Sequence, residues 1–103
     1  MILTVFRSKL REGVEEEYYD LAPKIVLEAE TMPGFISRKS YLADDGERLS
    51  LVAFDNEESQ RAWAKNAVHI NAMNKGRESF YSEYFVQVCE VVRESKFFRG
   101  EDS

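Results

Sequence analysis

The chain has 103 residues, of which 14 are basic and 19 acidic, so its formal net charge is −5. This length suits one domain with one hydrophobic core, and a hydrophobic content of 44% is too high for a disordered chain. The basic residues are scattered, so we expect no nucleic-acid partner. No apolar run reaches the roughly 20 residues that cross a bilayer, and the start lacks a signal-peptide pattern. We therefore expect a cytoplasmic protein with no membrane partner.

The beginning of the chain predicts a strand followed by a helix. Residues Ile2 to Lys9 alternate apolar with smaller or charged side chains, which indicates a strand. From Val14 to about Glu30, apolar residues recur at spacings of three and four, which indicates an amphipathic helix. Pro23 lies inside this segment and removes one backbone donor, so we expect a kink or a tight break near Leu21.

A hairpin is predicted in the middle of the chain. The Met32-Pro33-Gly34 step ends the helix, because glycine accepts a left-handed conformation and proline cannot continue a helix. Two β-prone runs follow, Phe35 to Ala43 and Leu49 to Asp55. The Asp44–Glu47 segment between them contains an Asp-Gly pair, which is typical of a hairpin turn.

The last part of the chain predicts helix and then strand. Asp55 or Asn56 can cap a helix whose body runs from Ser59 to about Val68. The segment from Ile70 to Arg77 either continues this helix or forms a second short one. The run from Phe80 to Val92 reads as the fourth strand. We expect one domain over residues 1–97 and a polar tail over residues 98–103.

The element order βαββαβ predicts an α+β, ferredoxin-like fold, in which helices cover one face of a four-stranded antiparallel sheet. The fourth strand is apolar on both faces and the first is nearly so, although a lone two-layer domain should have one wet face. The second face is economically covered by the sheet of another copy around a two-fold axis. We therefore expect a homodimer; the alternative is that the apolar face is exposed and tolerated.

Two stretches resemble the antibiotic biosynthesis monooxygenase family. One is the Met32–Phe35 turn, where a proline-glycine-phenylalanine step enters a strand. The other is the segment from Ala62 to His69, together with later residues of the second half: Gly76, Arg77, Phe80, Tyr81, Tyr84, Val88, Val92 and Arg93. The resemblance implies a dimeric α/β barrel. It also implies one of several activities, since the family contains oxygenases that act on polycyclic aromatic substrates without metal or organic cofactor, quinol oxygenases and haem-degrading enzymes.

The resemblance also implies candidate site residues. In the cofactor-free oxygenases an asparagine, a tryptophan and a basic residue hold a phenolic substrate, and Asn66, Trp63 and either Arg77 or Arg38 are the counterparts in this sequence. The haem-degrading relatives use an asparagine on the first strand, which this chain lacks. Haem degradation is therefore disfavoured, while haem binding through a helix histidine stays open.

The residues themselves favour His69 as the chemical group. It is the sole histidine, and its side chain exchanges a proton near neutral pH, so it is a candidate general base or metal-bound ligand. The alternative is an ordinary surface or capping histidine. Trp63 lies six residues earlier, about 240° around a helix, so the two side chains share a face only if the helix breaks between them. Otherwise Trp63 is a core residue, while Asn66 shares the face of His69 and could orient an imidazole or a substrate oxygen.

Three functions fit the sequence. The first is a small monooxygenase that binds an aromatic or quinol-like substrate in an apolar cavity and needs no cofactor, with His69, Asn66 and Trp63 as catalytic residues. The second is a non-catalytic protein that binds a small apolar ligand, and the third is haem binding. One histidine and one cysteine, Cys89, provide no metal-ligand spacing, so we expect no structural metal.

Overall fold

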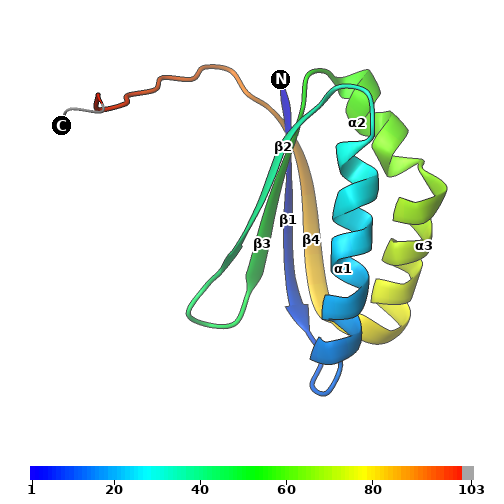
Figure 1. Cartoon of the computed structure of the whole chain (residues 1–103). Coiled ribbons are helices and arrows are strands. Elements are labelled where there is room, and N and C mark those ends of the chain that lie inside the picture. The colour runs from blue at the N-terminus through cyan, green and yellow to red at the C-terminus, as the bar shows by residue number, and fades with distance from the viewer. Residues whose placement is uncertain (101–103) are drawn as a thin grey trace.

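The computed structural model describes residues 1–100, which form a single sheet with all the helices on one of its faces (Figure 1). The strands are β1 (Ile2–Leu10), β2 (Phe35–Leu42), β3 (Arg48–Phe54) and β4 (Tyr81–Glu90). The helices are α1 (Glu15–Glu30), α2 (Glu57–Ala64) and α3 (Ala67–Lys75), and a π-helical turn, η1 (Gly76–Phe80), joins α3 to β4. Within residues 1–100, no helix is both long and apolar enough to cross a membrane.

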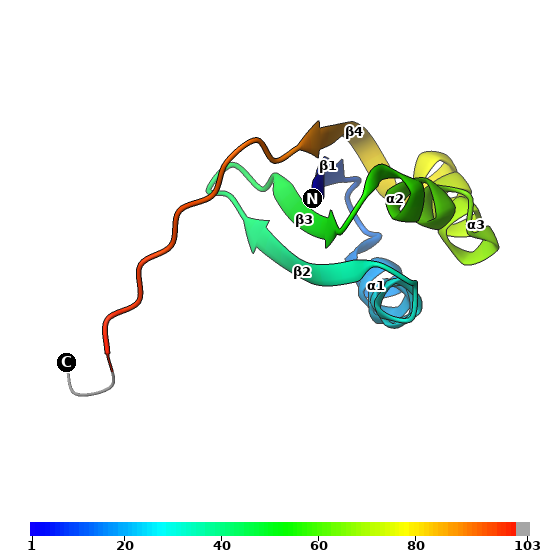
Figure 2. The ribbon, with the colours of Figure 1, turned by 90° about the horizontal axis from the view of Figure 1, so that it is seen from above.

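The four strands lie in the order β2-β3-β1-β4, and every neighbouring pair is antiparallel. This is the ferredoxin-like arrangement expected from the element order. Seen from above, α1 lies beside β2, and α2 and α3 lie farther along the same side of the sheet (Figure 2).

The strand register decides which residues face the helices. Thr4 of β1 lies opposite Val52 of β3 and Val88 of β4, and Arg38 of β2 lies opposite Val52. These even-numbered residues point to the helices, because neighbours along a strand point to opposite faces. The other face, here called the open face, is centred on apolar side chains: Leu3, Val5, Leu49, Leu51, Ala53, Phe85 and Cys89.

The buried core lies where α1 and α2 meet the sheet. Phe54 is completely buried and packs with Trp63 of α2 and Ala29 of α1. Phe35 meets the Phe54 ring edge-on, with centroids 6.0 Å apart. This cluster holds α2 against the sheet and so sets where the end of α2 lies.

The turn before β2 needs glycine. Gly34 has a φ of 83°, a left-handed conformation, and a Cβ at this position would collide with the side chains of Ser59 and Asp55. Gly46 in the β2–β3 hairpin has a φ of 89°, and the Asp45 carboxylate accepts a hydrogen bond from Glu47 N–H at 3.0 Å. Both turns are where the sequence predicts them.

The helices differ from the expectation at two points. The helix α1 continues through Pro23 from Glu15 to Glu30, so no break occurs. Pro23 lies on the exposed side of α1, where water can satisfy the carbonyl that loses its partner. The expected helix reaching Val68 ends instead at Ala64, because Asn66 caps a new helix there.

The chain after β4 leaves the domain. Residues 91–100 have no regular secondary structure and run away from the side that carries the helices (Figures 1 and 2). Phe97 and Phe98 in this stretch are 78% and 84% exposed. The domain boundary after residue 97 stays a prediction, and residues 101–103 of the predicted tail lie outside the described part.

Candidate functional site

A cavity of about 210 Å³ lies between the helix layer and the sheet. Its volume is below the roughly 300–1,000 Å³ typical of pockets for drug-sized ligands, so it suits a small one. Most of its lining is apolar and comes from α1, α3 and the even-numbered sheet residues: Phe6, Leu21, Ala22, Ile25, Val26, Ala29, Val52, Ala72, Met73, Phe80 and Val86. Val86 lines the cavity and is 46% exposed, so the cavity reaches solvent along the β4 edge.

The break between α2 and α3 brings Trp63 and His69 together. Both side chains line the cavity, and their ring centroids are 4.8 Å apart with the planes tilted by 51°. On one continuous helix the two rings would point apart. The sequence analysis required a helix break between Trp63 and His69 for their side chains to share a face, and the structure has this break. Trp63 is both a core residue and part of the cavity wall.

His69 is half-buried, and its surroundings favour the neutral imidazole. Burial lowers the pKa of His69, and a hydrogen bond with the Ala64 carbonyl, 3.4 Å from Nδ1, only partly offsets this effect. If Nδ1 donates to that carbonyl, Nε2 carries a free lone pair. A neutral imidazole beside an apolar cavity is able to accept a proton from a bound ligand.

Asn66 occupies the cap of α3 and does not line the cavity. Its Oδ1 accepts hydrogen bonds from the backbone N–H groups of Val68, at 2.8 Å, and His69, at 3.3 Å. Its Nδ2 donates to the Glu28 carboxylate at 3.3 Å and to the Met32 sulfur at 3.6 Å. Asn66 thus ties the first turn of α3 to α1 and fixes the backbone of His69; a catalytic role for Asn66 stays a prediction.

The two basic candidates are in different places. Arg38 lines the cavity from β2. Arg77 does not line it, and its guanidinium donates to the Tyr84 hydroxyl at 3.1 Å and to the Asn74 side chain. Of the two, only Arg38 is in a position to contact a ligand in this cavity.

Two tyrosines contribute hydroxyl groups to the cavity. Tyr18 of α1 and Tyr81 of β4 both line it, with ring centroids 6.2 Å apart. Burial, together with the neighbouring Tyr18, raises the pKa of Tyr81 well above its ordinary value. Tyr81 therefore remains protonated at physiological pH and can act as a hydrogen-bond donor.

The amino-acid sequence matches a known protein family. The family model described as antibiotic biosynthesis monooxygenase matches residues 1–75, almost three quarters of the chain. The chain belongs to the antibiotic biosynthesis monooxygenase family. The fold and the family expected from the sequence are therefore both confirmed.

Two relatives are similar in sequence. YqjZ of Bacillus subtilis is 28% identical over 93 residues, which cover 90% of this chain and 82% of YqjZ. A protein of Pyricularia oryzae named jasmonate monooxygenase ABM is 28% identical over 93 residues, which cover 88% of this chain. This chain spans only 43% of that fungal protein.

Two solved structures share the fold. Rv0793 of Mycobacterium tuberculosis superposes with a TM-score of 0.81 at 14% identity, covering 92% of this chain and 98% of the other. SnoaB, a cofactor-independent oxygenase of Streptomyces nogalater, superposes with a TM-score of 0.77 at 10% identity, covering 90% and 94%. At such low identity the likeness shows the fold alone.

Three polar residues that line the cavity were not foreseen from the sequence: Thr4, Ser50 and Gln60. Gln60 of α2 is only 8% exposed and lines the cavity, and Thr4 of β1 also lines it. One signal was available: Gln60 lies three residues before Trp63 and so shares its helix face. Among residues 1–100, no group of three or more His, Cys, Asp or Glu side chains is arranged to hold a metal ion.

Proposed function

We propose that this protein is a monooxygenase that binds a small aromatic or quinol-like substrate in the cavity and uses no cofactor. The observation that carries the proposal is the half-buried His69 imidazole, held against Trp63 at the wall of an apolar cavity, where burial lowers its pKa. Membership of the monooxygenase family supports the reaction class. The relatives named jasmonate monooxygenase and cofactor-independent oxygenase agree with it.

The chemistry needs a base, molecular oxygen and a dry site. His69 would accept a proton from an acidic C–H or O–H group of the substrate, leaving an electron-rich anion that transfers electrons to O₂. One oxygen atom would form a bond to the substrate carbon, and the other would leave as water. A CH₂ group between two aromatic rings is thereby oxidised to a carbonyl while O₂ is reduced, and atoms and electrons balance.

Side chains around His69 would assist this step. Tyr81, which remains protonated, would donate a hydrogen bond to an oxygen atom on which negative charge develops. Trp63 would stack against the flat face of an aromatic substrate. Asn66 would act as a positioning residue through its bonds to the first turn of α3.

Oxygen uptake tests the proposal. Purified protein is mixed with anthrone and with a panel of quinols, and dissolved oxygen is followed with an electrode. We expect substrate-dependent uptake that falls about 10²-fold or more in His69→Gln, because general-base catalysis typically contributes that much. Arg77→Gln is the matched control, since Arg77 lies outside the cavity, and it should keep the wild-type rate. Equal rates for wild type and His69→Gln would remove the base from the proposal.

A non-catalytic, haem-binding protein is the second candidate, because a histidine lines the cavity. Titration with hemin distinguishes the haem-binding protein from the monooxygenase. A Soret shift that disappears in His69→Ala would favour haem binding through this residue. Our proposal predicts no His69-dependent shift of the Soret band.

A cytoplasmic location for the protein stays a prediction.

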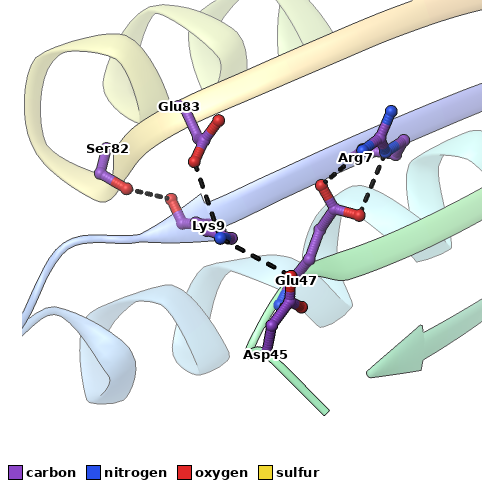
Figure 3. A network of polar contacts seen from close by, with 6 residues as sticks. All are labelled: Arg7, Lys9, Asp45, Glu47, Ser82 and Glu83. Atoms are coloured by element: carbon purple, nitrogen blue, oxygen red, sulfur yellow. Dashed lines mark hydrogen bonds and ion pairs between the residues drawn. The ribbon is translucent and has the colours of Figure 1, made fainter. Parts of the chain in front are cut away.

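We also propose that two copies pair through the open face. Its centre is apolar, and Phe85 there is 50% exposed in the single chain. Charged residues gather at one end of the sheet: Arg7 binds Glu47 at 3.0 Å, and Lys9 lies 3.7 Å from Asp45 and 3.9 Å from Glu83 (Figure 3). An apolar centre with a polar margin is typical of a protein interface.

A further inference from the structure

Three side chains of the cavity have polar groups without a partner. The Thr4 hydroxyl is buried and has no hydrogen bond within residues 1–100. The Gln60 side-chain amide and the Arg38 guanidinium also line the cavity, and neither has a hydrogen bond or ion pair in that part of the chain. Of the three, the Thr4 hydroxyl is the one that is fully buried, and buried polar groups normally have partners. A buried unpartnered hydroxyl beside an unpartnered amide and guanidinium, all around one cavity, points to a ligand that supplies partners.

The charge around the cavity identifies the kind of ligand. The protein carries a net charge of −5, yet no Asp or Glu of residues 1–100 lines the cavity. Arg38 is its one permanently charged lining residue, and His69 is favoured in the neutral form. Water can satisfy a hydroxyl or an amide, but it does not neutralise a half-buried guanidinium beside apolar walls.

The three groups are also close enough to act on one ligand. Arg38 and Thr4 lie in one row across the sheet, separated by Val52. Neighbouring strands are about 4.8 Å apart, so the two backbones are about 10 Å apart, a span that a long arginine side chain partly covers. Gln60 enters the cavity from α2, whereas Thr4 and Arg38 belong to the sheet.

We propose that the cavity binds an apolar ligand that carries a carboxylate, with Arg38 pairing to the carboxylate and Gln60 and Thr4 donating hydrogen bonds to the ligand's oxygen atoms. Arginine suits this task because its planar guanidinium donates two parallel bonds to a carboxylate. The inference rests on the proposed function, since it names the substrate class of the same cavity. The apolar part of the ligand would lie toward His69 and Trp63, where the proton is removed.

A pair of matched probes tests the inference. Trp63 is the sole tryptophan and lines the cavity, so its fluorescence reports binding there. We titrate the protein with 1-naphthoate and with 1-naphthamide, which have nearly the same shape and differ in charge. We expect 1-naphthoate to bind about tenfold more tightly, because hydrogen bonds to charged groups are stronger than those to neutral ones.

Four variants locate the preference. Arg38→Gln should bind both probes equally, while Arg38→Lys should keep part of the preference because it keeps the charge. Gln60→Leu should weaken binding of both probes. Arg61→Gln is the matched control, because Arg61 is exposed on α2, pairs with Glu57 at 2.6 Å and lies outside the cavity. Thermal melting confirms that each variant folds.

Each outcome has a definite meaning. Equal binding of the two probes by the wild type, no binding of either, or an unchanged preference in Arg38→Gln overturns the carboxylate inference. Oxygen uptake with neutral quinols would then still support the monooxygenase. Conversely, a preference that depends on Arg38 without any oxygen uptake would retain the carboxylate site and refute the catalytic function.

Discussion

His69 links the stability of the protein to pH. Burial lowers its folded-state pKa below its ordinary value of 6.5, so between these two values the unfolded chain binds more protons than the folded one. The contribution of His69 is therefore complete above pH 6.5 and is lost as the pH falls through the folded-state pKa. Because His69 is the sole histidine, NMR titration of its ring protons measures this pKa directly. We expect a midpoint below 6.5, and a midpoint at or above 6.5 would contradict the assigned burial.

Two constraints require glycine at position 34: its positive φ and the lack of room for a Cβ atom. In Gly34→Ala the residue keeps a strained φ of 83° and the new methyl group collides with Ser59 and Asp55. Gly13 has the same φ of 83° but nothing within 4 Å of its added Cβ, so Gly13→Ala is a matched control. We expect Gly13→Ala to cost about 1 kcal/mol of unfolding free energy and Gly34→Ala clearly more, measured by urea denaturation. Equal losses would show that the collision is relieved without cost.

At the scale of residues, the sequence draws attention to the candidate residues His69 and Trp63 but not to their surroundings. His69 stands out because it is the sole histidine, and Trp63 because it is the sole tryptophan. Gln60 carries no such signal, since glutamine is usually a surface residue. Its burial depends on the angle at which α2 meets the sheet, and that angle is set by packing around Phe54 rather than by the local sequence.

At the scale of elements, the break between α2 and α3 creates the site. Asn66→Ala should remove the α3 cap and cost about 1 kcal/mol of stability. It should also raise the pKa of His69 toward 6.5, because a frayed first turn lets water reach the imidazole. Chemical denaturation and NMR titration measure the two effects.

Asn56→Ala provides the control for that prediction. Asn56 caps α2 by accepting a hydrogen bond from Ser59 N–H at 2.8 Å, whereas the hydrogen-bond partners of His69 are Asn66 and the Ala64 carbonyl. It should cost similar stability and leave the His69 pKa unchanged. If both variants shift the pKa equally, the effect comes from general loosening and not from the α3 cap.

The strands were easier to predict than the helices. The hairpin turn is signalled by Gly46 and the β2 entry by Gly34, both at positive φ. The helix break was harder, because the segment from Ser59 to Val68 has the apolar spacing of one helix. Asn66 is its local signal, and tertiary bonds to Glu28 and Met32 reinforce the break.

At the scale of the whole molecule, the open face predicts a dimer. Leu51→Lys places a charge at the apolar centre of this face and should shift the protein to monomers in sedimentation velocity experiments. Leu27→Lys is the control, because Leu27 is already 65% exposed on α1. A wild type that stays monomeric at high concentration would remove the basis for pairing through this face.

The proposed function is that the protein inserts an oxygen atom into a substrate bound in the cavity, with His69 as the base. Mass spectrometry of the product formed under ¹⁸O₂ tests this most directly. From anthrone we predict a product carrying one ¹⁸O atom, formed by the wild type without added cofactor and strongly reduced in His69→Gln. A product without ¹⁸O, or labelling that His69→Gln leaves unchanged, would contradict it.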